Sequence, residues 1–394
     1  MSRPLVVYLD SSDYSIFSDA SRRTPELNRI ESKLLQLRDE NKIEFRFSHI
    51  NIIEAAPIKT EDRLSSSQRL ETIKRFCGCK CLVSYVFVIE NEIESLSNMR
   101  PIPTQLNHLN DDGIWFPSLA DIKEFSYLAD DIRENISKIP DRKKRRQAQR
   151  KSFNPDGSVK NAAGYLKGTV DSFAKEICSK YPLTEESAKL AAQSYFNNGS
   201  TANFVRLLSD SLSKLENISK WYELSWDEAT QLSSFLREIG GNLLKSLEQL
   251  KNESTVLAND YKLEGLSDSQ IKSRMNESFS GLLNSLPISM LKSLNVSHAS
   301  TSNQEISWEL CPSLLTLTTL SVNLVKLNSL TSRKAKNSDF GDILHATYLP
   351  HVDIFRCDGN TASIIEQAKL PIKTRVVSKL TDLPKEIENL LMRN

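Results

Sequence analysis

Two short apolar segments near opposite ends of the chain each run directly into an aspartate. Leu5–Leu9 precedes Asp10, and the mostly apolar segment 352–357 precedes Asp358. Runs of this kind are typical of strands that are buried on both faces of a parallel sheet. Because carboxyl ends of adjacent parallel strands meet at one edge, acids placed there converge. We therefore expect the chain to fold back and join segments over 300 residues apart.

Further acids flank these segments. Asp339 and Asp342 stand in the first turn of a predicted helix over 339–349, which Pro350 stops. Glu54 lies in a predicted helix that starts near Asn51, after a predicted strand over 43–47. The expected result is one acidic edge built from Asp10, Glu54, Asp339, Asp342 and Asp358.

The hydrophobic pattern predicts an α/β fold interrupted by an all-helical insertion. We expect the first part of the sheet domain over 1–100, the insertion over 101–309 and the second part over 310–394. The expected elements of the first part are a strand 4–9, a helix 24–40, the strand 43–47, the helix from Asn51, a helix 65–77 and a helix from Cys81 to Leu96. Those of the last part are a helix 312–330, the helix 339–349, a strand 352–356, a helix 360–368, a strand 372–377 and a helix after Pro384.

Within the insertion, Ser225 and Ser267 open capping-box patterns, and Gly240-Gly241 predicts a helix break.

Composition restricts the class of protein. The 394 residues carry a formal charge of +1, so any surface that attracts nucleic acid must be local. The sequence shows neither an apolar run of membrane-spanning length nor a secretory signal, and its six cysteines are scattered. We therefore expect a cytoplasmic protein that does not enter the membrane. Cys77-Gly-Cys79-Lys-Cys81 is read as a helix-to-strand junction in preference to a zinc site.

In order and local context, the acids resemble those of the PIN-domain nuclease family. Asp10 is similar to the family's acid after the first strand, Glu54 to the acid of the early helix, Asp342 to the acid that opens the late helix, and Asp358 to the acid after the fourth strand. Asp339 resembles an additional acid of some branches. The likeness covers 1–95 and 310–394 and implies a PIN-like parallel sheet. The chain departs from the family at Arg356 and Cys357, where Ser or Thr is usual, and Asn360 or Thr361 is a possible substitute.

The resemblance implies a metal-dependent endoribonuclease. Clustered carboxylates raise one another's pKa, and Mg²⁺ or Mn²⁺ relieves the repulsion through oxygen ligands. We expect Asp10, Glu54, Asp342 and Asp358 to hold the metal, with Asp339 supporting and with His345, Ser12 and Asn360 as possible auxiliaries.

Structural explanations remain open for each of these residues. Asp10, Asp339 and Asp342 also suit helix caps or first turns, Glu54 an exposed helix face and His345 a structural role, and His49 is equally open. Asp13, Asp19 and Asp353 are expected to be surface charges.

A basic cluster begins the insertion. Seven of ten positions carry positive charge: Arg142, Lys143, Lys144, Arg145, Arg146, Arg150 and Lys151. A solvated surface explains such runs most simply, whereas beside a nuclease centre they favour contact with the phosphate backbone of RNA. The alternatives are a non-catalytic scaffold that binds RNA or protein, and a DNA-cleaving nuclease. The insertion is also a possible surface for oligomerisation or for a protein partner.

Overall fold

A four-stranded parallel sheet joins the two ends of the chain. The protein was analysed as a computed structural model, which describes residues 3–98, 108–117, 119, 128–155, 157, 159–160, 169–199, 201–293, 306–330, 336 and 338–393. The strands are β1 (Leu5–Tyr8), β2 (Ile43–Arg46), β5 (Ile354–Arg356) and β6 (Arg375–Val377), in the order β2-β1-β5-β6. Val7 pairs with Ile354 and Tyr8 with Phe355 in parallel register. The predicted α/β class and the predicted return of the chain are confirmed.

Side chains of β1 alternate between two hydrophobic cores. Leu5 and Val7 belong to one cluster, while Val6 and Tyr8 belong to the other. Successive side chains of a strand point to opposite faces, so a strand covered on both sides must be apolar throughout. This arrangement explains why the segment before Asp10 shows no polar alternation.

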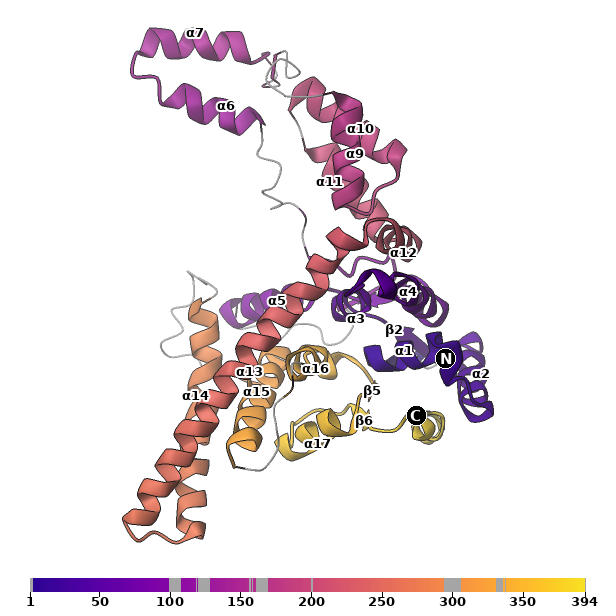
Figure 1. Ribbon diagram of the computed structural model, residues 1–394, viewed down its shortest axis with the longest axis vertical. Helices are drawn as coiled ribbons and strands as arrows, with labels where there is room; N and C mark the ends of the chain where they lie inside the picture. Colours follow the sequence, from indigo (N-terminus) through magenta and orange to yellow (C-terminus); the bar gives the residue numbers. More distant parts are fainter. Residues whose placement is uncertain are drawn as a thin grey trace.

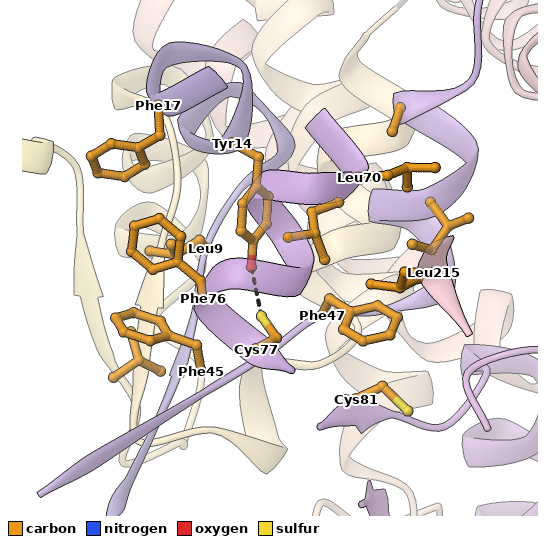
Figure 2. Packing of buried hydrophobic residues seen from close by; sticks show 14 of the residues in the cluster. Leu9, Tyr14, Phe17, Phe45, Phe47, Leu70, Phe76, Cys77, Cys81 and Leu215 are labelled. Atoms are coloured by element: carbon orange, nitrogen blue, oxygen red, sulfur yellow. Dashed lines mark hydrogen bonds between the residues drawn. The ribbon is translucent and has the colours of Figure 1, made fainter. Parts of the chain in front are cut away.

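Helices from both chain ends and from the middle cover the first face. They are α1 (Ser11–Ser18), α2 (Pro25–Asp39), α4 (Arg63–Cys77), α12 (Leu215–Leu224) and α18 (Leu383–Leu391). The Phe76 ring lies at the centre of this core, 5.2 Å from the Phe45 ring and 4.9 Å from the Phe17 ring (Figure 2). Beside them Tyr14 Oη lies 3.2 Å from Cys77 Sγ, which gives the buried phenol a polar partner.

The second face carries the helices nearest the acids. They are α3 (His49–Ala55), α5 (Tyr85–Asn98), α15 (Pro312–Leu330), α16 (Asp339–Ala346) and α17 (Gly359–Ala368). Tyr8 stacks on Phe355 here, with the ring centroids 5.3 Å apart. Since α3 and α16 lie against each other, the helices that carry Glu54 and Asp342 are brought to the same edge of the sheet.

The remaining helices belong to the middle of the chain, and those between residues 128 and 212 extend away from the sheet (Figure 1). They are α6 (Leu128–Ser137), α7 (Arg142–Ser152), α9 (Val170–Lys180), α10 (Glu185–Asn198), α11 (Ala202–Leu212), α13 (Trp226–Leu263) and α14 (Asp268–Ser293). The described part of 101–309 departs from the all-helical expectation at β4 (Leu109–Asn110). This strand pairs with β3 (Cys81–Leu82), and a single bridge joins Phe153 to Val159.

Three local predictions were wrong. Helix α13 continues through Gly240-Gly241, because it packs along α3, α15 and α16 and tertiary contacts outweigh the roughly 1 kcal/mol cost of a helical glycine. The segment from Cys81 begins as strand β3, and its helix starts only at Tyr85. Ser225 precedes α13 without capping it through its side chain, whereas the Ser267 box forms.

Helix α12 joins the middle of the chain to the sheet domain. Its Ile218 and Tyr222 are part of the first core, and Tyr222 Oη donates to the carbonyl of Ile52 in α3 at 2.9 Å. Ser219 Oγ lies 2.5 Å from Ser67 Oγ in α4. Among the described residues, no helix combines the length and apolar character needed to span a bilayer.

Candidate metal centre

Two of the acids cap helices at the carboxyl ends of adjacent strands. Asp10 follows β1 and accepts hydrogen bonds from Ser12 N at 3.3 Å and Ser12 Oγ at 3.1 Å. Asp358 follows β5 and accepts one from Thr361 N at 2.7 Å. Each carboxylate uses part of its hydrogen-bonding capacity as a cap. Capping and cation binding are compatible, because an ionised carboxylate has about four lone-pair sites.

Glu54 reaches the same edge from α3. Its Oε2 lies 2.9 Å from His345 Nε2, which comes from α16. A Cβ on Gly341, one turn before His345, would lie 2.4 Å from Glu54 Oε1. Only a residue without a side chain therefore lets the backbone of α16 approach this carboxylate.

Asp10, Glu54 and His345 each offer one ligand atom, and these atoms lie within 4.8 Å of one another. Asp342, one turn before His345, belongs to the same electrostatic group. Burial raises the pKa of Asp342 to about 7, and Asp10, Asp358 and Glu54 add to the shift while His345 opposes it. Asp342 is therefore close enough to Asp10, Asp358 and Glu54 for each of these carboxylates to disfavour its ionisation.

His345 opposes the repulsion among these acids when its imidazole is protonated. Burial alone would lower its pKa, but Glu54, Asp10 and Asp342 raise the pKa above the ordinary value. The other ring nitrogen, Nδ1, lies 2.6 Å from Tyr8 Oη, which in turn lies 2.6 Å from Ser48 Oγ. This buried chain fixes the orientation of the imidazole.

Glu54 is held in the charged form. Burial works against its ionisation, but His345, Ser11 and Arg69 lower its pKa below the ordinary value. Arg69 Nη1 also donates to the backbone carbonyl of Glu54 at 3.1 Å. Asn51 Nδ2 donates to Ser11 Oγ at 3.1 Å, and Ser11 Oγ lies 3.3 Å from His345 Nε2. Polar groups thus surround the acids on several sides.

Three other predicted residues have contacts or exposure of a different kind. The carboxylate of Asp339 is buried and accepts a hydrogen bond from Lys336 N, in the segment that precedes α16. His49 packs beside Tyr85 and Trp115, and burial lowers its pKa to about 4. Asn360 is exposed in the first turn of α17.

Asp13 was wrongly expected at the surface. It is fully buried and forms an ion pair with Arg356 at 2.9 Å. Burial raises the pKa of Asp13 to about 7, although Arg356 opposes the shift. Asp353 is also more than a surface charge, since it pairs with Arg3 and accepts a hydrogen bond from Val6 N. Arg356, which stands where the family usually has Ser or Thr, therefore has a structural partner in Asp13.

The basic run and the cysteine cluster, which the sequence analysis also singled out, have separate places in the fold. Seven basic residues fall within or at the ends of α7, which Figure 1 shows at the end of the molecule away from the sheet. Cys77 closes α4 and Cys81 opens β3, as the junction interpretation predicted. All six cysteines are free.

Three residues of the centre were not anticipated from the sequence. Tyr8 could have been found from alternation, because it precedes Asp10 by two residues and so shares its side of the strand. Gly341 stands between two acids at a helix start, which hints at close backbone approach. Arg69 gives no local signal, since its link to Glu54 depends on how α4 packs against α3.

Comparison of the whole chain with protein-family models, curated proteins and solved structures found no match.

Proposed function

We propose that the chain is a PIN-like, metal-dependent nuclease, and most specifically an endoribonuclease. One observation carries the proposal: acids from β1, α3, α16 and β5 converge at the carboxyl edge of a parallel sheet. This proximity raises the pKa of Asp342: burial is the largest cause, Asp10, Asp358 and Glu54 add to it, and the pKa reaches about 7. The parallel sheet flanked by helices and the sequence likeness add support, and the preference for RNA comes from the likeness.

The donor set suits a hard divalent cation. Carboxylate oxygens are the preferred protein ligands of Mg²⁺ and Mn²⁺, and Asp10, Glu54, Asp342 and Asp358 would hold the ion directly or through water. Their mutual repulsion is the interaction that a bound cation relieves. When bound, such an ion would supply Lewis-acid stabilisation of phosphate charge and would lower the pKa of a water molecule bound to it.

The chain's own polar groups position the acids and the phosphate. Tyr8 holds His345, and His345 holds Glu54, so one line of contacts runs from the buried strand to the carboxylate. Ser11 Oγ lies beside the same pair, 3.3 Å from His345 Nε2, and its hydroxyl can turn from Glu54 to a phosphate oxygen. Positioning of this kind accounts for much of the rate in phosphoryl chemistry.

A cleavage assay tests the proposal. Wild-type protein in millimolar Mn²⁺ or Mg²⁺ should cut a mixed RNA substrate, whereas Asp10→Asn and Asp342→Asn should abolish cleavage and remain folded. Asp19→Asn is the matched control, since Asp19 caps a short 3₁₀ helix outside the cluster. Single-stranded DNA of the same sequence distinguishes a ribonuclease from a DNA-cleaving enzyme.

Two outcomes would overturn this function. Cleavage retained by both site variants would show that the acids are not the centre. Wild-type protein with neither a thermal shift in Mn²⁺ nor cleavage of RNA or DNA would favour the non-catalytic scaffold. We further propose a cytoplasmic location, because six free cysteines suit a reducing compartment.

A further inference from the structure

A basic cleft lies between the hairpin of α6 and α7 and the turn that follows α7. Its volume is about 710 Å³. The side chains that line it are Arg133, Arg146, Gln149, Arg150, Phe153, Asn154, Pro155 and Lys160, together with Gly157. Four of them are cationic, and none of the described residues that line the cleft carries a carboxylate. Arg133 and Lys160 lie outside the basic run that the sequence singles out.

Helical geometry separates the basic residues of α7 into different groups. Arg146, Gln149, Arg150 and Phe153 are spaced along one helix face, and that face lines the cleft. Arg145 turns back and donates to the carbonyls of Ile139 and Pro140. Lys143, Lys144 and Lys151 are exposed outside the cleft.

Packing within the hairpin holds the cleft open. Ile132, Ile136, Phe153 and Val159 form a small hydrophobic cluster beneath it. The Arg133 guanidinium lies 5.1 Å from the centre of the Phe153 ring. Lys160 Nζ donates to the carbonyl of Arg150 at 3.0 Å, which anchors the returning chain against the end of α7. The cationic groups are therefore mounted on a folded support.

The charge arrangement is unfavourable without an anion. Arg142, Arg146 and Arg150 follow one another at four-residue spacing, and like charges at this spacing destabilise a helix. Elsewhere such positions carry opposite charges, as in Glu134–Lys138, Glu176–Lys180 and Arg206–Asp210. Among the described residues, no carboxylate lies within 4.0 Å of a cationic nitrogen of Arg146 or Arg150. A bound polyanion would remove this repulsion.

We propose that the α6–α7 cleft binds the phosphodiester backbone of a single-stranded polynucleotide, separately from the acidic centre. Its cationic walls match a row of phosphates, and its open shape suits a strand passing through better than one enclosed small anion. The inference rests on the proposed function for the identity of this ligand. Figure 1 shows the hairpin at one end of the molecule and the sheet in its middle, so one strand that occupies both sites must extend between them.

Binding without metal tests the cleft independently of cleavage. Fluorescence anisotropy with a labelled single-stranded RNA in EDTA would compare the wild type with Arg146→Gln/Arg150→Gln and with Lys143→Gln/Lys144→Gln. Both variants remove two charges from α7, but only the first removes them from the cleft. The cleft variant should raise Kd on the order of tenfold and reduce the salt slope by about 1 for each lost phosphate contact.

The lysine variant should retain most of the affinity. Equal weakening by the two double variants would overturn the proposal, because it would reveal attraction by net charge alone. Unchanged RNA binding in the cleft variant would overturn it as well. Circular dichroism of all variants would show whether α7 remains helical, and a further variant, Lys160→Gln, should weaken binding because it removes a cation of the cleft that lies outside α7.

The same experiment separates this inference from the nuclease proposal. Single-stranded DNA should bind the cleft with affinity similar to that of RNA, since the contacts are to the backbone. If wild-type protein binds both strands through Arg146 and Arg150 but cleaves neither in Mn²⁺, the nuclease proposal fails and the cleft stands. If it cleaves RNA while the cleft variant binds normally, the reverse holds.

Discussion

Single residues in the candidate centre divide into those that carry charge and those that hold the charge in place. Glu54 and His345 form a pair at 2.9 Å, and Tyr8 fixes the far side of the imidazole. Gly341 contributes only the space that its missing side chain leaves for Glu54. Activity should therefore depend on Tyr8 and Gly341, although neither is proposed to bind the metal.

Gly341→Ala tests that dependence. The added Cβ would lie 2.4 Å from Glu54 Oε1, so the carboxylate must move and the contact with His345 is lost. Stability should change by less than about 1 kcal/mol, because a flexible side chain yields and alanine favours the helix. We expect weakened Mn²⁺ binding and strongly reduced cleavage with a nearly unchanged urea midpoint. Wild-type cleavage by this variant would contradict the close approach.

The raised pKa of Asp342 makes metal-free stability depend on pH. Its folded pKa of about 7 lies above the ordinary 3.8, so its contribution is complete below the ordinary pKa and is lost as pH rises through 7. Asp342→Asn cannot ionise. In EDTA at about pH 8, the free energy of unfolding of Asp342→Asn should exceed that of the wild type by about 1–2 kcal/mol after solvent screening, and its melting temperature should be higher. Both differences should vanish at about pH 4.

Differential scanning fluorimetry across that pH range provides the measurement. Mn²⁺ should raise the melting temperature of the wild type and leave that of Asp342→Asn almost unchanged. A variant less stable than the wild type at high pH would show that Asp342 makes a favourable contact in place of a repulsive one.

The sequence singles out Asp10, Asp342 and Asp358 because their signal is local: each follows an apolar strand or stands in the first turn of a helix. Glu54 lies near the end of α3, and only its place in the series of acids drew attention to it. Asp13 was misassigned for the opposite reason. Its partner Arg356 stands on β5, far away in sequence, and no periodicity reveals such a pair. The role of Tyr8 was equally hidden, because a tyrosine in an apolar strand resembles any core residue until His345 is placed beside it.

Among secondary-structure elements, those with a strong hydrophobic period were predicted to within a few residues. Strands β1 and β2 and helices α2, α4 and α15 are examples. The failures occurred where tertiary packing competes with local preference. Helix α13 retains its glycines because it is supported along its length, and β3 exists because β4 pairs with it. Neither the packing of α13 nor the pairing of β3 with β4 can be inferred from a short stretch of sequence.

The contact between α12 and α3 links the middle of the chain to the centre. Tyr222→Phe removes the hydrogen bond to the Ile52 carbonyl, two residues before Glu54. We expect a loss of about 1 kcal/mol or more in unfolding free energy, because a buried acceptor loses its partner. Mn²⁺ affinity measured by calorimetry should also fall, since α3 is held less firmly.

Ser219→Ala is the control for this effect. It removes a buried hydroxyl from the same helix, but that hydroxyl faces Ser67 in α4. It should cost stability with little change in Mn²⁺ affinity. If both variants leave the affinity equally unaffected, α12 supports the fold without supporting the metal centre.

At the scale of the whole molecule, a buried histidine pair should govern unfolding in acid. The His108 and His351 rings lie 4.3 Å apart, and His351 Nε2 lies 2.6 Å from Ser313 Oγ. Burial lowers the pKa of His108 to about 4 and that of His351 well below its ordinary value. Burial also raises the pKa of neighbouring Glu92 to about 7. Protonation of Glu92 therefore favours the folded state as the pH falls, which partly offsets the effect of the histidines.

For His108 the folded pKa lies below the ordinary 6.5, so its contribution is complete above that pH and is lost as pH falls toward 4. The loss should reach roughly 3 kcal/mol. His108→Phe cannot gain a proton and should show a flatter decline in urea denaturation between about pH 7 and 4. Identical declines for variant and wild type would place the acid sensitivity elsewhere.

The capture of a divalent cation by the acidic edge is tested most directly by anomalous scattering from crystals soaked in Mn²⁺. A peak within coordination distance of Asp10, Glu54, Asp342 and Asp358, absent from crystals of Asp342→Asn, is the result expected. Ordered side chains with no peak between them in the wild type would contradict it.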